Sequence, residues 1–262
     1  MTMRPGVPQL PFTTTTAGAN AVKVDIHPVT YATPAALDTG ASPSTVLSVS
    51  ASTTLVPSGA WTGWQSVVKR TIDLVGAVLI LILISPLLVA IAAAIWIESP
   101  GPIIFRQPRM GRNGRVFTFF KFRSMTSDAE SRRGELLRHN ESTGPLFKIR
   151  EDPRVTRVGR VLRRFSLDEL PQLFNVIRGE MSLVGPRPPL PSEVAHYELW
   201  QKDRLLVPGG ITGLWQVSGR SDLTFEQMVE LDLTYIKTWS LWSDLTILVR
   251  TVTCVIFARG AY

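Results

Sequence analysis

One long stretch without a charged side chain constrains the fold of this chain more than any other feature. Residues 74–97 form a run of 24 positions with no Asp, Glu, Lys or Arg. An α-helix rises about 1.5 Å per residue, so a helix of this length matches a hydrocarbon core roughly 30 Å thick. A shorter run would suit a helix buried in a protein core, but this length predicts a membrane helix.

The middle and the flanks of this run indicate its path through the membrane. Ser85 and Pro86 lie at its centre, where a proline kinks or breaks a helix and a serine hydroxyl can bond a freed carbonyl. Lys69 and Arg70 precede the run, and the arginine-rich segment 106–123 follows it. Because cytoplasmic flanks are rich in Lys and Arg, we predict a re-entrant helix that breaks at the Ser-Pro pair and leaves by its entry face. A kinked single span is the alternative.

The first 65 residues differ in composition from the rest of the chain. Residues 1–65 are rich in Thr, Ser, Ala, Pro and Gly, and their full charges are limited to Arg4, Lys23, Asp25 and Asp38. Their short apolar clusters follow no sustained period, so this segment cannot bury enough apolar surface to offset its chain entropy. We predict a disordered, low-complexity tail without a catalytic role.

The remaining chain is expected to divide into a re-entrant membrane helix, residues 66–98, and a folded domain on the cytoplasmic face, residues 99–262. The glycine-containing segment 111–114 predicts a turn. It would join hairpin strands at 103–107 and 116–120. Helices are predicted at 127–142, 168–178, 191–205 and 224–236, and an interfacial helix with tryptophans at its start at 239–257. The predicted fold class is α+β and mostly helical, in a monotopic membrane protein.

The sharpest local signal for chemistry is the pair Asp168-Glu169, which follows Arg163 and Arg164 by about one turn. The structural alternative is helix capping, because Ser166 and Glu169 match a capping box and acidic residues stabilise a helix N-terminus. The functional interpretation is that a helix N-terminus and two arginines attract phosphate oxygens, so that a carboxylate meets a phosphorus atom there. Adjacent helical residues point about 100° apart, so the two acids are expected to play different parts.

Two later segments suit phosphate binding. Four prolines in residues 185–191 stiffen the loop around Arg187, which fits a bidentate phosphate clamp. A rigid loop whose arginine pairs with a surface acid fits this stretch equally well. Residues 208–220 are rich in glycine and end in Arg220, which lets backbone N–H groups approach phosphates, although the spacing is not that of a P-loop.

The charge of the chain favours acidic partners. A formal net charge of +7 suits nucleic acid, anionic lipid or phosphate-bearing substrates. The basic segment 106–123 is explained by a solvated face against lipid headgroups, and Lys121 within it is a candidate contact for a lipid phosphate. The single cysteine, Cys254, excludes an internal disulfide and a cysteine-based zinc cluster, and the histidines lack ligand spacing.

Taken together, these motifs resemble those of the bacterial sugar transferases, the monotopic phosphoglycosyl transferases that begin the assembly of exopolysaccharide, capsule, O-antigen and glycoprotein glycans. They occur in the family's order, and the resemblance covers about residues 66–262. The matching pieces are Lys69-Arg70 with Asp73, Ser85-Pro86, residues 99–107, 120–125, 166–175, 179–188 and 208–217, and Tyr235. A re-entrant helix broken at the Ser-Pro pair is also a family feature.

The resemblance implies a reaction and its residues. A hexose 1-phosphate would pass from a UDP-sugar to a polyprenyl (undecaprenyl) phosphate, giving polyprenyl-diphosphate-sugar and UMP, with Mg²⁺ as cofactor. Asp168 would be the nucleophile and the Mg²⁺ contact, with Glu169 as its catalytic partner. The residues that bind phosphate or substrate would be Arg163, Lys121, Arg187 and Arg220.

Other functions compete with this enzyme. A catalytically idle membrane-surface scaffold of a polysaccharide-assembly complex would use the basic face, but it needs no Asp168-Glu169 pair beside arginines. Nucleic-acid binding would explain the net charge, but it is not expected of a membrane enzyme. It would be favoured if the protein were soluble without detergent and its binding weakened steeply with salt. We expect the bacterial inner membrane, with the catalytic domain on the cytoplasmic face, and the sequence is compatible with a homo-oligomer.

Overall fold

The computed structural model describes residues 61, 63–136, 138, 140–141, 144–147, 149, 151–219 and 222–256. The tail expected over residues 1–65 therefore lies largely outside the described residues. Of that segment, Trp61 is described and is buried, with 6% of its surface exposed, and residues 64 and 65 already belong to the first helix.

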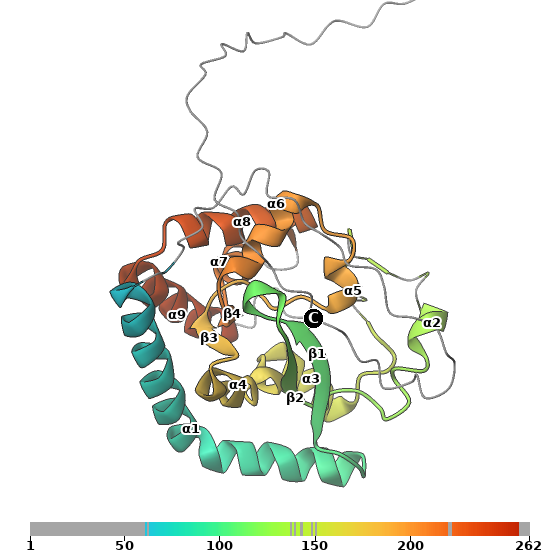
Figure 1. The fold of residues 1–262 in the computed structure, drawn as a ribbon. Helices are drawn as coiled ribbons and strands as arrows, with labels where there is room; N and C mark the ends of the chain where they lie inside the picture. Colours follow the sequence, from blue (N-terminus) through green and yellow to red (C-terminus); the bar gives the residue numbers. More distant parts are fainter. Residues whose placement is uncertain are drawn as a thin grey trace, which may run out of the picture. The chain divides into compact units, whose positions relative to one another are not determined.

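The described elements are short helices and strands that follow one long helix (Figure 1). The α-helices are α1 Trp64–Glu98, α2 Arg133–Leu136, α3 Arg157–Arg164, α4 Gln172–Arg178, α5 Pro191–Val194, α6 Leu199–Lys202, α7 Leu214–Ser218, α8 Phe225–Lys237 and α9 Leu241–Ile256. The strands are β1 Ile104–Met110, β2 Val116–Phe122, β3 Met181–Val184 and β4 Gly209–Thr212. Short 3-10 helices include η1 Arg112–Gly114, η3 Leu167–Glu169 and η4 Asp203–Leu206. The predicted α+β, mostly helical class is confirmed.

Helix α1 is the only described helix whose length and composition suit a membrane crossing. Only 11% of its most apolar window is buried inside the molecule, so most of its apolar side chains face outward. This helix indicates that the protein associates with a membrane.

The predicted Ser-Pro feature lies inside α1. Figure 1 shows a sharp bend part-way along this helix, and helical structure continues through Pro86, so α1 is bent and not interrupted. The hydroxyl of Ser85 donates to the carbonyl of Ile82 at 2.9 Å. That carbonyl stands four residues before Pro86, and the proline has no N–H to bond it. The expected bond between the serine and a freed carbonyl is therefore confirmed.

Two small sheets support the rest of the fold. Strands β1 and β2 pair antiparallel, with Ile104 opposite Phe122 and Met110 opposite Val116. The predicted hairpin is confirmed, and each strand is longer than expected. Strands β3 and β4 pair in parallel. Just after β3, Gly185 approaches β4 so closely that a Cβ on Gly210 would lie 2.1 Å from the Gly185 nitrogen.

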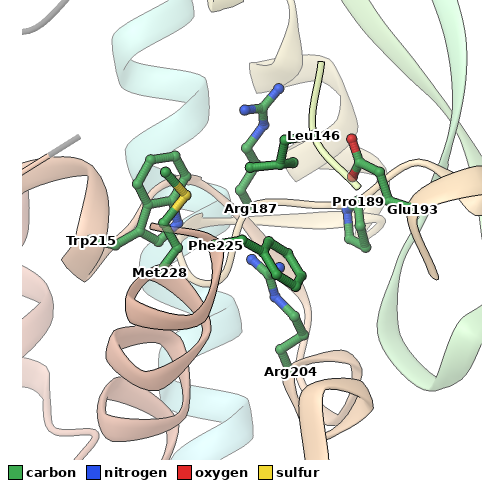
Figure 2. A pocket seen from close by; sticks show the side chains of 8 residues that line it. All are labelled: Leu146, Arg187, Pro189, Glu193, Arg204, Trp215, Phe225 and Met228. Atoms are coloured by element: carbon green, nitrogen blue, oxygen red, sulfur yellow. The ribbon is translucent and has the colours of Figure 1, made fainter. Parts of the chain in front are cut away.

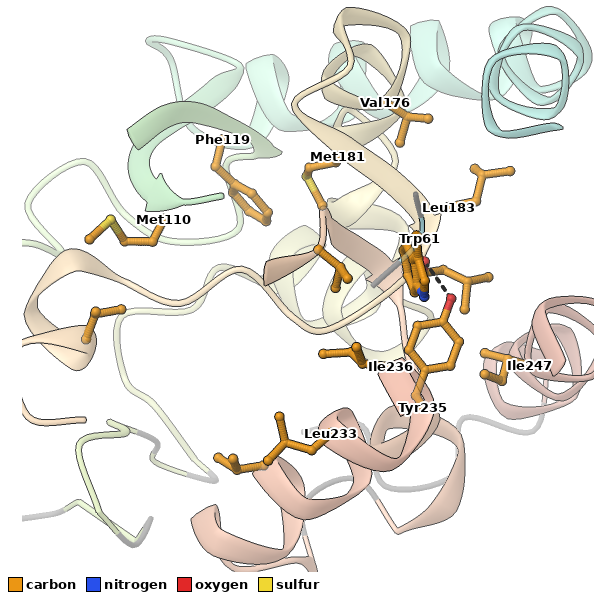
Figure 3. Packing of buried hydrophobic residues seen from close by; sticks show 14 of the residues in the cluster. Trp61, Met110, Phe119, Val176, Met181, Leu183, Leu233, Tyr235, Ile236 and Ile247 are labelled. Carbon is orange, nitrogen blue, oxygen red and sulfur yellow. Dashed lines mark hydrogen bonds between the residues drawn. The ribbon is translucent and has the colours of Figure 1, made fainter. Parts of the chain in front are cut away.

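The main core lies where α1, β3, α8 and α9 meet (Figure 3). The hydroxyl of Tyr235 lies 2.6 Å from Oδ1 of Asp244 and 3.1 Å from the carbonyl oxygen of Val184. The ring of Trp61 meets Tyr235 edge to face, with centroids 5.6 Å apart. These contacts bring Trp61, β3 and the last two helices into one core.

Several predicted helices are shorter or more broken in the structure. The expected helix over 127–142 is reduced, within the described residues, to α2. The expected helix over 191–205 is split into α5, α6 and η4, because Glu198 adopts an extended conformation and caps α6. Helix α8 agrees with the prediction for 224–236, and α9 with that for 239–257.

Candidate active site

Asp168 and Lys121, two of the predicted site residues, form a close ion pair. The ammonium group of Lys121 lies 2.6 Å from Oδ2 of Asp168 and 4.0 Å from Oε1 of Glu169. Asp168 is 2% exposed. A buried carboxylate is unfavourable without an opposite charge, and Lys121, at the end of β2, supplies that charge.

The chain reaches Asp168 through a tight turn. Ser166 adopts a left-handed conformation with φ 53°, and its side chain makes no capping hydrogen bond. Instead, the backbone N–H of Glu169 donates to the Ser166 carbonyl at 3.3 Å. The capping-box alternative is therefore wrong, and the single helix expected over 168–178 is divided into η3 and α4.

The two acids differ in their surroundings, as the sequence suggested. Residues of a 3-10 turn point about 120° apart, so neighbours cannot face the same way. The side chain of Asp168 is 3% exposed and faces Lys121, whereas that of Glu169 is 30% exposed. Glu169 is therefore accessible to a ligand while Asp168 is held inward.

Arg163 is a second cation whose charge interacts with that of Asp168. It lies in the last turn of α3, and its Nε donates to the hydroxyl of Ser124 at 3.0 Å. Burial lowers the pKa of Arg163, and the negative charges of Asp168 and Asp152 oppose that shift. Asp152 in turn is bonded by Arg154, whereas Asp168 is paired with Lys121.

A close approach of two backbones holds Arg163 in place. A Cβ on Gly159 in α3 would lie 2.0 Å from the carbonyl oxygen of Ser124. That carbonyl also accepts from the N–H of Thr156 at 3.2 Å, and the Thr156 hydroxyl caps α3 by accepting from the Gly159 nitrogen. Helix α3 therefore packs directly against Ser124, the residue to which its own Arg163 donates a hydrogen bond.

Arg109 belongs to the site, although the sequence placed it only within a solvated basic face. It is 8% exposed and lies over the ring of Phe119 at 5.2 Å. Burial lowers its pKa to about 10, with the charge of Arg187 acting in the same direction and those of Glu193 and Glu169 opposing it. The prediction of a solvated basic face is therefore wrong at this position, because Arg109 is buried and bonds the proline loop.

The proline loop is bonded to β1. Arg109 donates to the carbonyl of Pro188 at 3.0 Å, and the backbone N–H of Met110 donates to the carbonyl of Pro189 at 2.9 Å. Arg187 itself is exposed. It lines a cavity of about 20 Å³ with Trp215 and Phe225 (Figure 2), which has room for about one water molecule.

The predicted residues are thus brought together in part. Asp168, Glu169 and Lys121 form one cluster, the charge of Arg163 acts on Asp168, and Arg187 lies in the loop that Arg109 bonds. Arg220 lies outside the described residues. Arg109 was missed because its partners in the proline loop are far away in the sequence, 79 residues in the case of Pro188.

The acids of this cluster suit a magnesium ion that also binds a substrate. Mg²⁺ is commonly held by one or two carboxylates together with substrate phosphates and water. Asp168 and Glu169 supply such carboxylates, and no cluster of three or more His, Cys, Asp or Glu side chains that could hold a metal occurs among the described residues. The donor set fits Mg²⁺ shared with a phosphate better than a metal enclosed by protein alone.

Comparison with known proteins decides the family. The family model described as "Bacterial sugar transferase" matches residues 64–258. The chain belongs to this family. The matched sugar transferase region begins at the start of α1 and includes every described site residue named above.

Several named sugar transferases and related enzymes are similar to the chain. Galactosyl transferase CpsE of Streptococcus agalactiae serotype III (strain NEM316) is 47% identical over 196 residues, which cover 74% of this chain and 43% of the relative. Undecaprenyl-phosphate galactose phosphotransferase of Salmonella typhimurium is 43% identical, with 74% and 41% covered. UDP-glucose:undecaprenyl-phosphate glucose-1-phosphate transferase of Caulobacter vibrioides is 43% identical, with 74% and 72% covered. The chain therefore matches about two fifths of the length of the first two relatives.

Proposed function

We propose that this sugar transferase moves a hexose 1-phosphate from a UDP-sugar to undecaprenyl phosphate or a similar polyprenyl phosphate, releasing UMP. The observation that carries the proposal is the buried Asp168 carboxylate paired with Lys121, with Arg163 near enough for the two charges to affect each other, within the region that matches the family. The names of the Salmonella and Caulobacter relatives support the lipid acceptor, and the latter name supports a UDP-sugar donor. Such a transfer would begin the assembly of an exopolysaccharide, capsule or O-antigen type of glycan.

Asp168 is the proposed nucleophile. One of its carboxylate oxygens attacks the phosphorus that carries the sugar, the bond to the bridging oxygen of the diphosphate breaks, and UMP leaves with that oxygen and the electron pair. An oxygen of polyprenyl phosphate then attacks the same phosphorus, and the carboxylate leaves. Covalent catalysis divides an exchange between a soluble and a lipid-bound substrate into two steps.

The surrounding cations make the approach of a carboxylate to a diphosphate possible. Lys121 holds Asp168 before the donor binds, and its flexible side chain then follows the incoming phosphate. Arg163 neutralises phosphate charge from a fixed position beside Ser124. Arg187 and Arg220 are proposed to bind the donor phosphates from the neighbouring loops.

Mg²⁺ is proposed as the cofactor, held by Asp168 with Glu169 as the second carboxylate. When bound, it supplies positive charge that neutralises the diphosphate. Glu169, which is the more exposed acid, can also reach outward to the metal or the substrate.

The proposed topology places both ends of α1 on the cytoplasmic face of the inner membrane. The bend of α1 and the Ser85 bond that accompanies Pro86 support a re-entrant path over residues 66–98 (Figure 1). The catalytic part, residues 99–262, would then lie on the cytoplasmic face. Helix α9 would rest in the interface, because Trp242, Leu245 and Val249 on it are exposed.

Cysteine labelling tests this topology. Single cysteines placed at Val68 and Arg112, in a chain whose Cys254 is replaced by Ser, are expected to react only with a reagent applied from the cytoplasmic side. Labelling of the two positions from opposite sides would establish a single span and leave the proposed chemistry untouched.

Release of UMP tests the reaction. Purified protein in nanodiscs is supplied with undecaprenyl phosphate, Mg²⁺ and a panel of UDP-hexoses, and Asp168→Asn is the matched control. Lipid-dependent UMP release from one donor, reduced to background in the variant, is the expected outcome. No release from a folded, membrane-bound protein across the panel would favour the idle scaffold instead.

A further inference from the structure

The hairpin that carries Lys121 has a strand edge that no other strand of the described residues covers. Strands β1 and β2 form a two-stranded sheet, so each has one edge without a strand partner. Unpaired backbone groups at a buried edge need other bonding partners. At β2, the side chain of Asn175 from α4 provides them.

The oxygen and the nitrogen of the Asn175 side-chain amide each bond the backbone of β2. Its Oδ1 accepts from the backbone N–H of Phe120 at 3.1 Å, and its Nδ2 donates to the carbonyl of Thr118 at 2.7 Å. This is how a residue of a parallel strand bonds its neighbour, donating to one residue and accepting from the residue two positions on. One side chain thus takes the place of a strand along this part of β2.

The remaining bonds of Asn175 fix the amide in this orientation. Its Nδ2 also donates to Oε2 of Glu180 at 2.6 Å, and the residue is 0% exposed. Both amide hydrogens and one oxygen lone pair are therefore engaged, and no solvent competes for them. The link between α4 and β2 is short, buried and directional.

This link connects the two chain segments that carry the ion pair. Lys121 directly follows Phe120, whose N–H Asn175 holds, and η3 with Asp168 leads directly into α4. The far end of α4 is held in turn by Arg70 of α1, which donates to the carbonyls of Val176 and Ile177. Helix α4 is therefore fixed against both the strand and the membrane helix.

We propose that Asn175 is a positioning residue that holds Lys121 at Asp168, and that it does so without contacting the substrate. The inference rests on the proposed function, because it assigns Asn175 to the step in which Asp168 attacks the donor. Loss of the amide would release β2 from α4 and let Lys121 move relative to the carboxylate. A misplacement of about 1 Å at a reacting group can lower a rate by about 10²-fold.

A double-mutant cycle tests the proposal. Asn175→Ala is expected to lower kcat for UMP release by about 10²-fold, with KM for the UDP-sugar nearly unchanged. In a Lys121→Met background, the same substitution is expected to cost less than about threefold, because residues that act through one another are not additive. If Asn175 had a purely structural role, Asn175→Ala would lower kcat by the same factor in both backgrounds. That result would overturn the proposal.

Two controls separate positioning from loss of stability. Glu180→Gln keeps an acceptor for Asn175 and leaves both bonds to β2 intact, so its kcat is expected to stay near that of the wild type. Val229→Ala removes volume from a fully buried site in α8 and lowers stability away from the ion pair. If Val229→Ala also lowered kcat strongly in the wild type and only weakly in the Lys121→Met background, the proposal would be wrong.

The same cycle is also measured by a property that does not depend on activity. This is the melting temperature, in nanodiscs, of the wild type, the two single variants and the double variant. Lys121→Met is expected to lower the melting temperature in the wild type and to change it much less in Asn175→Ala, or in Asn175→Ser if the alanine variant does not fold. Additive shifts would overturn the proposal. An inactive wild-type protein would refute the proposed function, whereas an active one with additive effects would refute only the role of Asn175.

Discussion

At the scale of single residues, Asp168 lies where a negative charge is unfavourable unless cations surround it. Its two neighbours differ in kind. Lys121 is a point charge on a flexible stem, and its side chain is 25% exposed, so it can move with a ligand. Arg163 is bonded to Ser124 and packed through Gly159, so it stays in place. A fixed cation and a movable one suit a carboxylate that must first be held and then released to react.

Arg109→Met should weaken binding of the donor more than it slows the chemistry. The variant loses the hydrogen bond to Pro188, and a bond from a charged donor contributes about 1.5 kcal/mol or more. The proline loop with Arg187 should loosen, and KM for the UDP-sugar should rise about tenfold. Steady-state UMP release measures this. For Arg106→Met, at an exposed position of the same strand, KM should stay within about twofold of the wild-type value. An equal rise of KM in both variants would contradict the role of Arg109.

Gly159→Ala should displace Arg163. The added Cβ would lie 2.0 Å from the Ser124 carbonyl, so α3 must move away at a cost of about 1–3 kcal/mol. We expect a lower melting temperature and a marked loss of UMP release. Gly134→Ala in α2 is the matched control, because nothing lies within 4 Å of its added Cβ. Unchanged activity of Gly159→Ala would show that Arg163 does not depend on this close approach.

At the scale of elements, the membrane helix is bonded into the folded part at three points near its start. Lys69 reaches Oδ2 of Asp244 in α9 at 2.7 Å, and Asp73 accepts from the N–H of Leu183 in β3 at 3.0 Å. Arg70 bonds the last carbonyls of α4, where a cation also complements the helix dipole.

Arg70→Met should separate α1 from α4. The variant leaves the carbonyls of Val176 and Ile177 without this donor, and we expect the free energy of unfolding to fall by about 2 kcal/mol. Activity should fall as well, because α4 follows Asp168 directly. Thermal melting and UMP release measure the two effects. Thr71→Ala, which removes a local bond to Val67 at an exposed position, should leave both within error of the wild type; equal losses would argue against a specific junction.

At the scale of the whole molecule, α1 serves two environments. Most of its apolar side chains face outward, yet Ala77, Ile91 and Ile95 are buried in the two hydrophobic clusters of the folded part. The helix that indicates membrane association is therefore also part of the protein core. Trp61, before α1, packs in the same core against Tyr235 and Trp239.

Truncation should reveal this double role. A chain of residues 53–262 is expected to fold in nanodiscs and to release UMP, because it keeps Trp61 and all of α1. A chain of residues 99–262 is expected not to fold, because it lacks the buried side chains and the three anchoring charges of α1. Limited proteolysis and melting curves measure both. A stable, protease-resistant 99–262 fragment would show that the catalytic part does not need α1.

Much of the fold could be predicted from neighbouring residues. The uncharged run predicted α1, the glycine turn predicted the β1–β2 hairpin, and the helices expected over 224–236 and 239–257 lie close to the observed ends of α8 and α9. The Ser85 bond followed from the carbonyl that Pro86 leaves free. The errors lay where local signals conflicted with tertiary contacts. Ser166 matched a capping box, but its left-handed conformation turns the chain so that Asp168 faces Lys121.

The residues of the candidate site could be predicted from the sequence, because charge and chemical reactivity are properties of single side chains. Asp168, Glu169, Lys121 and Arg163 could therefore be named from motifs. Their arrangement was not readable, since it depends on contacts between distant segments. Asn175 bonds Thr118 and Phe120, which are 57 and 55 residues away, and the motif 166–175 that it ends gives no sign of these partners. Local patterns reflect backbone preferences and solvation over a few residues, whereas the pairing of a helix with a strand edge exists only after the chain has packed.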